Sequence, residues 1–262
     1  MLACVGLGAC AATDRLALAE RQAAPAGLQF QIVETPAYRL AVWRRLRDPS
    51  LPVDVYIEGD GLAWLDRTHP SPDPTPRHPV GLLLAVADPA PNVIYLARPC
   101  MYVDLRRETH CQTGTWTDGR FDQSAVEAID RALGQMKPAA MPANLVGYSG
   151  GAAIAVALAA RRRDILSLRT VAGNLDPAAV NRLHHVSRMP TAIDVAALAP
   201  RLKLLPQRHF VGNDDKIVPA SIAERFSSEV GACAAVGRVA ASHGEGWHEQ
   251  WPRLLQMPLP CR

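Results

Sequence analysis

The chain has 262 residues, of which 48% are hydrophobic and 20% charged, and its net charge is +3 at pH 7. These values lie near globular averages, and the length suits one large domain with a sizeable core. Aromatic residues make up only 5% of the chain and no basic run alternates with them, which excludes nucleic acid as the expected partner.

The first twelve residues are small and apolar and resemble the end of an export signal. Within them, the Leu-Gly-Ala-Cys that ends at Cys10 resembles a bacterial lipobox, whose cysteine becomes lipidated and forms the mature N-terminus. The basic segment that normally opens such a signal is missing, so an ordinary apolar N-terminus is the alternative. We interpret residues 1–27 as a candidate export or lipoprotein signal with a linker from residue 13, and residues 28–262 as the folded domain.

The cysteines outside this segment also indicate export. There are four, and an even number is typical of disulfides in an oxidising compartment. Of the three possible pairings we predict Cys100–Cys111 and Cys233–Cys261, because each closes a local loop and would contribute roughly 3 kcal/mol. Four buried thiols in a cytosolic protein are the alternative. We therefore expect a periplasmic protein or a lipoprotein attached to a membrane through Cys10, and a cytoplasmic protein if the N-terminus is not a signal.

After residue 27, apolar segments typical of strands alternate with longer segments of helical period. The predicted strands span Leu28–Glu34, Tyr38–Arg44, Val53–Ile57, Asn92–Ala97, Ala143–Tyr148, Leu168–Ala172, Arg208–Val211 and Gly237–Ala241. The predicted helices span Val80–Ala87, Phe121–Met136, Gly150–Arg163, Pro219–Glu229 and Trp247–Leu255. Residues 66–79, rich in proline, and residues 98–120 are long loops, and loops of the second length are usually functional or cross-linked.

This order of elements predicts an α/β protein. We expect a mostly parallel, twisted sheet of about eight strands with helices on both faces and right-handed crossovers, in which the first two strands pair antiparallel. No segment after the N-terminal one reaches the ~18 uninterrupted apolar residues of a membrane span. No internal repeat or convincing boundary divides residues 28–262.

The segment Gly147-Tyr-Ser149-Gly-Gly151 is a G-x-S-x-G motif, which by itself occurs by chance in roughly one such chain in ten. Its context makes it more specific, because a hydrophobic strand precedes it and an alanine-rich helix follows it. In such a turn the serine adopts a strained backbone conformation, and side chains two residues away would clash, so glycine is needed there. The helix N-terminus directs its dipole at the reacting oxygen. We predict Ser149 as a nucleophile and the N–H of Gly150 as an oxyanion donor; a structural Gly-Ser turn is the alternative.

Further motifs accompany this turn: Glu-Gly-Asp-Gly at residues 58–61, Ala-Arg-Pro-Cys at 97–100, and Gly-Trp…Trp-Pro within 246–252. The combination resembles the α/β-hydrolase superfamily, and within it a group of bacterial hydrolases of unknown substrate. The resemblance covers roughly residues 28–256. It implies the α/β-hydrolase fold and a catalytic triad in the chain order serine, acid, histidine.

The resemblance also identifies the acid. The segment from Gly212 to Pro219 is similar to the G-x-x-D-x-x-V-P that follows the penultimate strand in the superfamily, and Asp215 occupies the acid position. Asp214 is the alternative acid, or a turn former. Asp176 follows the strand after the nucleophile, where some members carry the acid, although a helix cap is the better interpretation.

The base is expected just after the last strand. His243 ends a strand-like run and precedes a Gly-rich turn, so it can reach the edge of the sheet where the serine lies. His248 is the alternative, although its position in the predicted terminal helix is more typical of a surface histidine. We predict the triad Ser149, His243 and Asp215.

The loop after the third strand should supply the second oxyanion donor. We predict the N–H of Gly61, with that of Asp60 next. Glu58 and Asp60 depart from the superfamily pattern, because an unpaired carboxylate beside a developing oxyanion would oppose catalysis. We expect both to turn away and to pair with the backbone or with a base such as Arg98 or Arg67.

These residues predict a serine hydrolase of carboxylic esters or thioesters that works through an acyl-enzyme. The alternatives are a catalytically silent envelope lipoprotein of the same fold, and a peptidase or acyltransferase with the same triad. We expect a monomer acting on a small-molecule ester-like substrate with a small or medium acyl group, covered by the 98–120 loop. No cofactor is required, and the cysteines and histidines lack metal-ligand spacing.

Overall fold

The computed structural model describes residues 14–261, so Cys10 and the other residues of the candidate signal up to residue 13 lie outside the described residues. The described chain forms an eight-stranded sheet in the order β1-β2-β4-β3-β5-β6-β7-β8. β2 is antiparallel to both β1 and β4, whereas the other neighbouring pairs are parallel. The strands are β1 (Gln29–Glu34), β2 (Arg39–Leu46), β3 (Val53–Ile57), β4 (Asn92–Leu96), β5 (Ala143–Tyr148), β6 (Ile165–Val171), β7 (Gln207–Gly212) and β8 (Ala234–Val239). The predicted mostly parallel sheet is confirmed.

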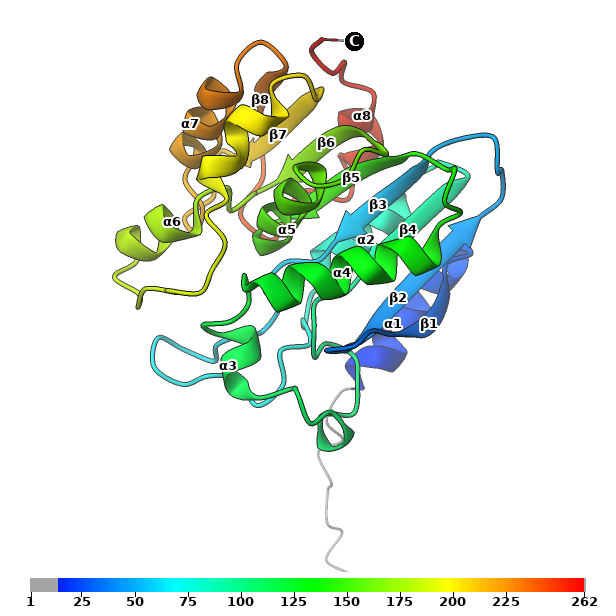
Figure 1. Cartoon of the computed structure of the whole chain (residues 1–262), viewed down its shortest axis with the longest axis vertical. Helices are drawn as coiled ribbons and strands as arrows, with labels where there is room; N and C mark the ends of the chain where they lie inside the picture. The colour runs from blue at the N-terminus through cyan, green and yellow to red at the C-terminus, as the bar shows by residue number, and fades with distance from the viewer. Residues whose placement is uncertain (1–13, 262) are drawn as a thin grey trace, which may run out of the picture.

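Helices cover both faces of this sheet, as predicted (Figure 1). One face carries α1 (Arg15–Ala23), α2 (Val80–Ala87) and α8 (Trp251–Leu255), and the other carries α4 (Gln123–Met136), α5 (Gly150–Ala159), α7 (Ala220–Val230) and the 3₁₀ segment η3 (Ala196–Leu202). The shorter elements η1 (Ala24–Ala26), η2 (Leu105–Arg107), α3 (Thr113–Trp116) and α6 (Pro177–Leu183) lie in connections. The two faces hold two separate apolar clusters, so the sheet is buried on both sides.

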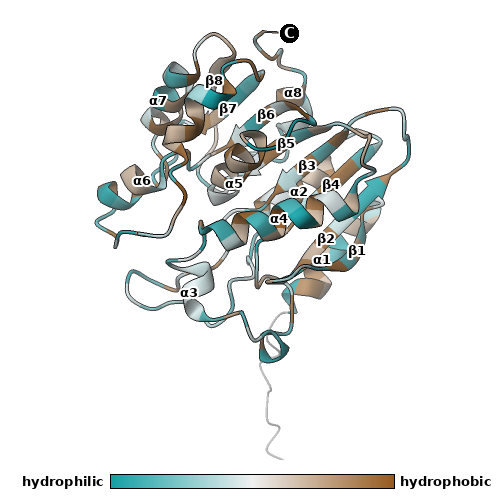
Figure 2. Ribbon diagram, in the orientation of Figure 1, coloured by the Kyte–Doolittle hydropathy of each residue, from teal (hydrophilic) through white to brown (hydrophobic). Residues whose placement is uncertain are grey.

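The two helices beside the central strands differ in sequence because they differ in burial. α4 buries Ala125, Ile129, Ala132 and Leu133 at helical spacing and exposes its other side to solvent, which appears in Figure 2 as alternating teal and brown. All ten residues of α5 are buried, and most of them are alanine or glycine. Small side chains allow α5 to pack closely on β5, and this contact fixes the turn that joins them.

The segment predicted as a linker contains a helix. α1 begins after Asp14, whose carboxylate accepts the Ala17 N–H, and it buries Ala19 and Ala23 in the same apolar cluster as α2. Arg15 forms an ion pair with Asp73 of the proline-rich loop. The sequence signal was weak because the fully buried residues are small alanines, which contribute little hydrophobic periodicity, and Leu16 is only partly buried against the cluster.

Two element boundaries near the C-terminus also differ from prediction. β8 begins at Ala234 rather than at Gly237. Its first three residues lie at the edge of the sheet and are only partly buried, so they show no alternation of buried and exposed positions that would have predicted a strand. α8 begins at Trp251 rather than Trp247, since a turn rather than a helix follows the last strand.

Both predicted disulfides are present. Cys100 and Cys111, with Cα atoms 5.6 Å apart, close part of the 98–120 loop, and Cys233 and Cys261, 5.1 Å apart, fasten the C-terminal tail to the start of β8. No helix within residues 14–261 has both the length and the apolar character needed to cross a membrane.

Candidate active site

Ser149 occupies the sharp turn between β5 and α5 and has φ 49° and ψ −121°. A non-glycine residue with positive φ is strained, so its surroundings must hold it there. Its own N–H donates to the Val171 carbonyl at 2.9 Å, and its carbonyl accepts the N–H groups of Ala152 and Asn174. Ser149 is partly exposed, which leaves its hydroxyl accessible.

The glycines of the motif are explained by steric contacts. A Cβ on Gly147 would lie 2.5 Å from the Ala152 Cα, and a Cβ on Gly151 would lie 2.3 Å from the Ile57 carbonyl oxygen. Both distances are far below van der Waals contact with backbone atoms, which cannot move without disturbing β3 or α5. Glycine two residues before and after the serine is therefore required, as predicted from the motif.

The three residues predicted as a triad lie in hydrogen-bond contact. His243 Nε2 is 3.0 Å from Ser149 Oγ, and His243 Nδ1 is 2.9 Å from Asp215 Oδ2. Ser149 follows β5, Asp215 follows β7 and His243 follows β8, so all three come from the carboxyl ends of parallel strands. These ends lie at one edge of the sheet, where residues 94 positions apart in sequence meet.

Asp215 is held as an anion. Its side chain is 1% exposed, and its Oδ1 accepts the N–H groups of Ile217 and Val218 at 2.8 and 2.9 Å. Desolvation by burial would raise its pKa, but the hydrogen bond and charge of His243 and the two backbone donors outweigh desolvation and hold the pKa below its ordinary value. The carboxylate is thus suited to orient the imidazole.

The alternative acids and base lie elsewhere. Asp214 is exposed, and no hydrogen bond of its side chain is recorded in the structure. Asp176 caps α6, as predicted, by accepting the Ala179 N–H at 2.8 Å. His248 is exposed and lies 3.3 Å from Glu249. None of the three is in hydrogen-bond contact with Ser149 or His243 among the contacts recorded for residues 14–261.

Two aromatic residues position the loop that carries His243. The Tyr148 hydroxyl and the Trp247 Nε1 both donate to the His243 carbonyl oxygen, each at 3.1 Å. Neither role was predicted, although Tyr148 is the variable residue of the serine motif and Trp247 belongs to the Gly-Trp motif. An aromatic residue at each of these motif positions is visible in the sequence, but only the tertiary structure shows that both side chains bind the His243 carbonyl oxygen.

The loop after β3 approaches the serine through Gly59 and Asp60. A Cβ on Gly59 would lie 3.2 Å from the Ser149 Cβ, and a Cβ on Gly150 would lie 1.9 Å from Asp60 Oδ1. Gly61 has φ 63°, and its missing Cβ would meet the Pro74 carbonyl and Met101 instead. The Asp60 side chain therefore lies against Gly150, whereas Gly61, the first choice in the sequence prediction, lies against Pro74 and Met101.

Glu58 turns away from the serine and binds backbone groups. It is buried and accepts the N–H groups of Gly59, Gly81 and Leu82, together with the Tyr95 hydroxyl at 2.9 Å. It thereby satisfies donors at the N-terminus of α2. Desolvation raises its pKa above the ordinary value, against the effect of these hydrogen bonds.

Asp60 pairs with two arginines. Arg98 Nη1 lies 3.3 Å from Asp60 Oδ1, and Arg120 Nε lies 3.0 Å from Oδ2. Arg98 was a predicted partner, whereas Arg120 was not, and nothing in the local sequence near residue 120 indicates it. The other predicted partner, Arg67, instead donates to the His184 carbonyl at 3.4 Å.

A cavity of about 530 Å³ adjoins this part of the molecule. It is lined by residues of the 58–67 loop, the end of the 98–120 loop and the segment after α6, including Trp64, Arg67, Asp118, Arg120, Asn181 and His184. Arg120 lines this cavity and also forms the ion pair with Asp60. Around it, Leu65, Leu183, Val186 and Ile217 expose about half of their surface. Most of the lining residues are polar or charged, although their apolar atoms contribute slightly more than half of the lining surface.

Among the described residues, no group of three or more histidine, cysteine or acidic side chains could hold a metal ion.

No family model matches the sequence, and no curated protein matches it either. Solved structures do match the fold. An alpha-beta serine hydrolase homologue from Coxiella burnetii is 16% identical, with a TM-score of 0.57 over 86% of this chain and 93% of that chain. Est1E from Butyrivibrio proteoclasticus is 11% identical, with a TM-score of 0.57 over 86% and 97%. The thioesterase domain from the curacin biosynthetic pathway is 17% identical, with a TM-score of 0.53 over 87% and 97%.

Proposed function

We propose that this chain, which has the α/β-hydrolase fold, is a serine hydrolase of carboxylic esters or thioesters. The observation that supports the proposal best is the continuous contact from Ser149 Oγ to His243 at 3.0 Å and from His243 to Asp215 at 2.9 Å. A serine hydroxyl is a poor nucleophile by itself, and this arrangement supplies both the base and its orienting acid.

In the proposed reaction, His243 Nε2 takes the hydroxyl proton as Ser149 Oγ forms a bond to the substrate carbonyl carbon. Asp215 accepts the Nδ1–H hydrogen bond, which leaves Nε2 free as the base and stabilises the imidazolium that forms. The carbonyl oxygen becomes an oxyanion, which accepts a hydrogen bond from the Gly150 N–H. The imidazolium then protonates the leaving alcohol or thiol as its bond to carbon breaks. A water molecule, deprotonated by His243, then attacks the acyl-enzyme. The imidazolium returns this proton to Ser149 Oγ as the bond from Oγ to the acyl carbon breaks, which releases the acid.

We assign the second oxyanion donor to the Asp60 N–H in place of Gly61. Gly59 packs on the Ser149 Cβ and the Asp60 side chain packs on Gly150, so the peptide between them lies beside the first donor. No protein acceptor is recorded for the Asp60 N–H in the described structure. An oxyanion-hole donor of this kind is worth about 10²–10³ in rate.

We also propose that the protein is exported. The two disulfides support this proposal, because such bonds persist in oxidising compartments. Lipidation of Cys10 would then attach the domain to a membrane surface, with α1 directly after the anchor. Growth with radiolabelled palmitate, comparing the wild type with Cys10→Ser, tests this: a label that the variant also carries would contradict the assignment.

The activity is tested by labelling and by turnover. A fluorophosphonate probe should label the folded wild type on Ser149 and leave Ser149→Ala unlabelled. A series of nitrophenyl esters should then give turnover with short and medium acyl chains. A folded wild type that neither reacts with the probe nor hydrolyses any ester would favour a silent member of the fold. A preference for long chains would contradict the expected small or medium acyl group.

A further inference from the structure

A cluster of one carboxylate and two guanidinium groups lies beside the serine turn. Each oxygen of Asp60 binds a different arginine, Arg98 at 3.3 Å and Arg120 at 3.0 Å. The side chains are 4%, 13% and 25% exposed for Arg98, Arg120 and Asp60. Ion pairs this well buried hold their geometry more firmly than surface pairs, because water competes little for either partner.

The two arginines are themselves fixed. Arg98 Nη2 donates to the Arg120 carbonyl and Arg120 Nη1 donates to the Thr117 carbonyl at 2.5 Å. Both guanidinium groups also lie over the ring of Phe121, at 5.4 and 5.0 Å from its centroid. The cluster is therefore a rigid clamp on Asp60 rather than a mobile surface network.

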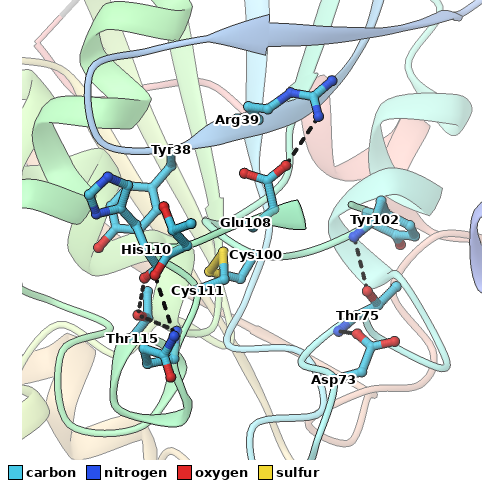
Figure 3. Close-up of a disulfide and its surroundings, with 12 residues drawn as sticks. Tyr38, Arg39, Asp73, Thr75, Cys100, Tyr102, Glu108, His110, Cys111 and Thr115 are labelled. Atoms are coloured by element: carbon cyan, nitrogen blue, oxygen red, sulfur yellow. Dashed lines mark hydrogen bonds and ion pairs between the residues drawn. A yellow bond between two sulfur atoms is a disulfide. The ribbon is translucent and has the colours of Figure 1, made fainter. Parts of the chain in front are cut away.

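Arg98 and Arg120 lie at the two ends of the 98–120 loop, and the Cys100–Cys111 disulfide closes part of the loop between them (Figure 3 shows the disulfide). The same loop is tied to β2 through Arg39 and Glu108 at 3.1 Å, and to the proline-rich loop through the Tyr102 N–H and the Thr75 hydroxyl at 2.9 Å. The clamp thus connects the oxyanion loop after β3 to a cross-linked scaffold.

The position of Asp60 makes the clamp relevant to the serine. Its Oδ1 fills the space where a Cβ of Gly150 would lie, so the side chain and the proposed donor N–H are adjacent. While both arginines hold the Asp60 carboxylate in this space, they restrict the backbone conformations that the Asp60 peptide can adopt next to Gly150. A free carboxylate there would also repel the oxyanion, whereas one carboxylate with two guanidinium groups leaves the cluster with a surplus of positive charge.

We propose that Arg120 and Arg98 are positioning residues, which clamp the Asp60 carboxylate so that the Asp60 N–H is aimed at the oxyanion. This inference rests on the proposed function. In this inference the arginines act through Asp60, so Arg120 and Asp60 should behave as one unit.

The test measures ester turnover for Arg120→Met, Asp60→Ala and the double variant. Arg120→Met should lower kcat on the order of 10²-fold with KM changed by less than about threefold, as expected when a group is displaced near the reacting atoms. Asp60→Ala should lower kcat similarly, although it removes a negative charge. The double variant should lose no more than either single one, because the clamp is already broken. Arg120→Lys, which retains the charge, should recover part of kcat.

A second readout measures the oxyanion directly. Phenylboronic acid forms a bond from boron to Ser149 Oγ while the hydroxyl proton passes to His243, and the product is a tetrahedral anion. Its affinity should fall in parallel with kcat. Arg162→Met is the matched control: Arg162 also binds two groups, Asp130 at 2.6 Å and Asp164 at 2.7 Å, and its side chain is 17% exposed. This control should lose thermal stability but keep kcat and boronate affinity.

The outcomes that would contradict this inference differ from the outcome that would contradict the proposed function. The inference is overturned if Arg120→Met keeps wild-type kcat, if Asp60→Ala raises kcat, or if the double variant loses the product of both single effects. Should Arg120→Met not fold, Asp60→Ala and Arg120→Lys decide the question by the same measurements. A wild type that neither turns over esters nor binds the boronic acid would overturn the proposed function and, with it, this inference.

Discussion

At the scale of single residues, the reactivity proposed for Ser149 depends on groups that are ordinary in isolation. In the proposed mechanism the hydroxyl gains a base because His243 reaches it from another loop, and Asp215 orients that base because it remains charged. Burial alone would favour the neutral acid at Asp215, but the imidazole and two backbone N–H groups reverse that preference. The lowered pKa keeps this carboxylate ionised when the pH falls toward its ordinary range.

Asp215→Asn should lower kcat by about 10⁴-fold while leaving the fold intact, because an amide favours the wrong tautomer of the imidazole. The measurement is kcat for a nitrophenyl ester, together with a circular dichroism spectrum. Asp214→Asn is the control, since Asp214 is exposed and should retain nearly full activity. Comparable losses in both variants would contradict the assignment of the acid.

At the scale of elements, the conformation of the turn between β5 and α5 was predictable from the sequence, whereas the contacts that the 98–120 loop makes with the rest of the molecule were not. The turn is local, so its glycines, its serine and its alanine-rich helix are adjacent in sequence. The loop acts through contacts between residues about 60 positions apart, such as Arg120 and Asp60. The sequence indicated a long cross-linked loop and offered Arg98 as one candidate partner for the acidic residues, but nothing in it indicated Arg120.

Replacing Cys100 and Cys111 together by serine should lower the free energy of unfolding by about 3 kcal/mol and also lower kcat, because this loop carries both clamping arginines. Replacing Cys233 and Cys261 should cost similar stability with kcat unchanged, since that disulfide fastens only the tail to β8. Denaturant titration and kcat measure the two effects separately. Equal effects on kcat would show that the first disulfide has no special relation to the site.

At the scale of the whole molecule, a polar cluster joins β3, β5, α2 and α8. Asp54 is partly buried, accepts the Asn144 amide at 2.7 Å and lies beside Asp88, which accepts the Tyr56 hydroxyl at 2.5 Å. The Trp251 indole in turn donates to that hydroxyl at 2.8 Å. Desolvation and the neighbouring Asp88 raise the pKa of Asp54 to about 7.

The folded protein therefore binds this proton more tightly than the unfolded chain. Between about pH 4 and pH 7 the folded state holds more protons, so stability should fall as pH rises through this interval, and above it the full penalty remains. Because Asp54 is partly exposed, we expect a loss of only about 2 kcal/mol. Asp54→Asn should remove this dependence and stabilise the protein at pH 8.

Denaturant titrations at pH 5 and pH 8 measure this effect, with Asp214→Asn as the exposed control. The critical result is the sign of the change in the free energy of unfolding between the two pH values. If the wild type were more stable at pH 8 than at pH 5, and Asp54→Asn did not show this difference, the raised pKa of Asp54 would be contradicted.

The sequence by itself determined what depends on neighbouring residues: the alternation that predicts the sheet, the strained serine turn with its glycines, and the disulfides between cysteines that close local loops. The tertiary structure alone decided which side chain lies against Gly150, that Arg120 joins Arg98 in holding Asp60, how Glu58 caps α2, and that residues 15–23 form a helix. The reason is physical. Side-chain periodicity and turn chemistry act over a few residues, whereas ion pairs and close backbone approaches depend on where the strands place distant loops.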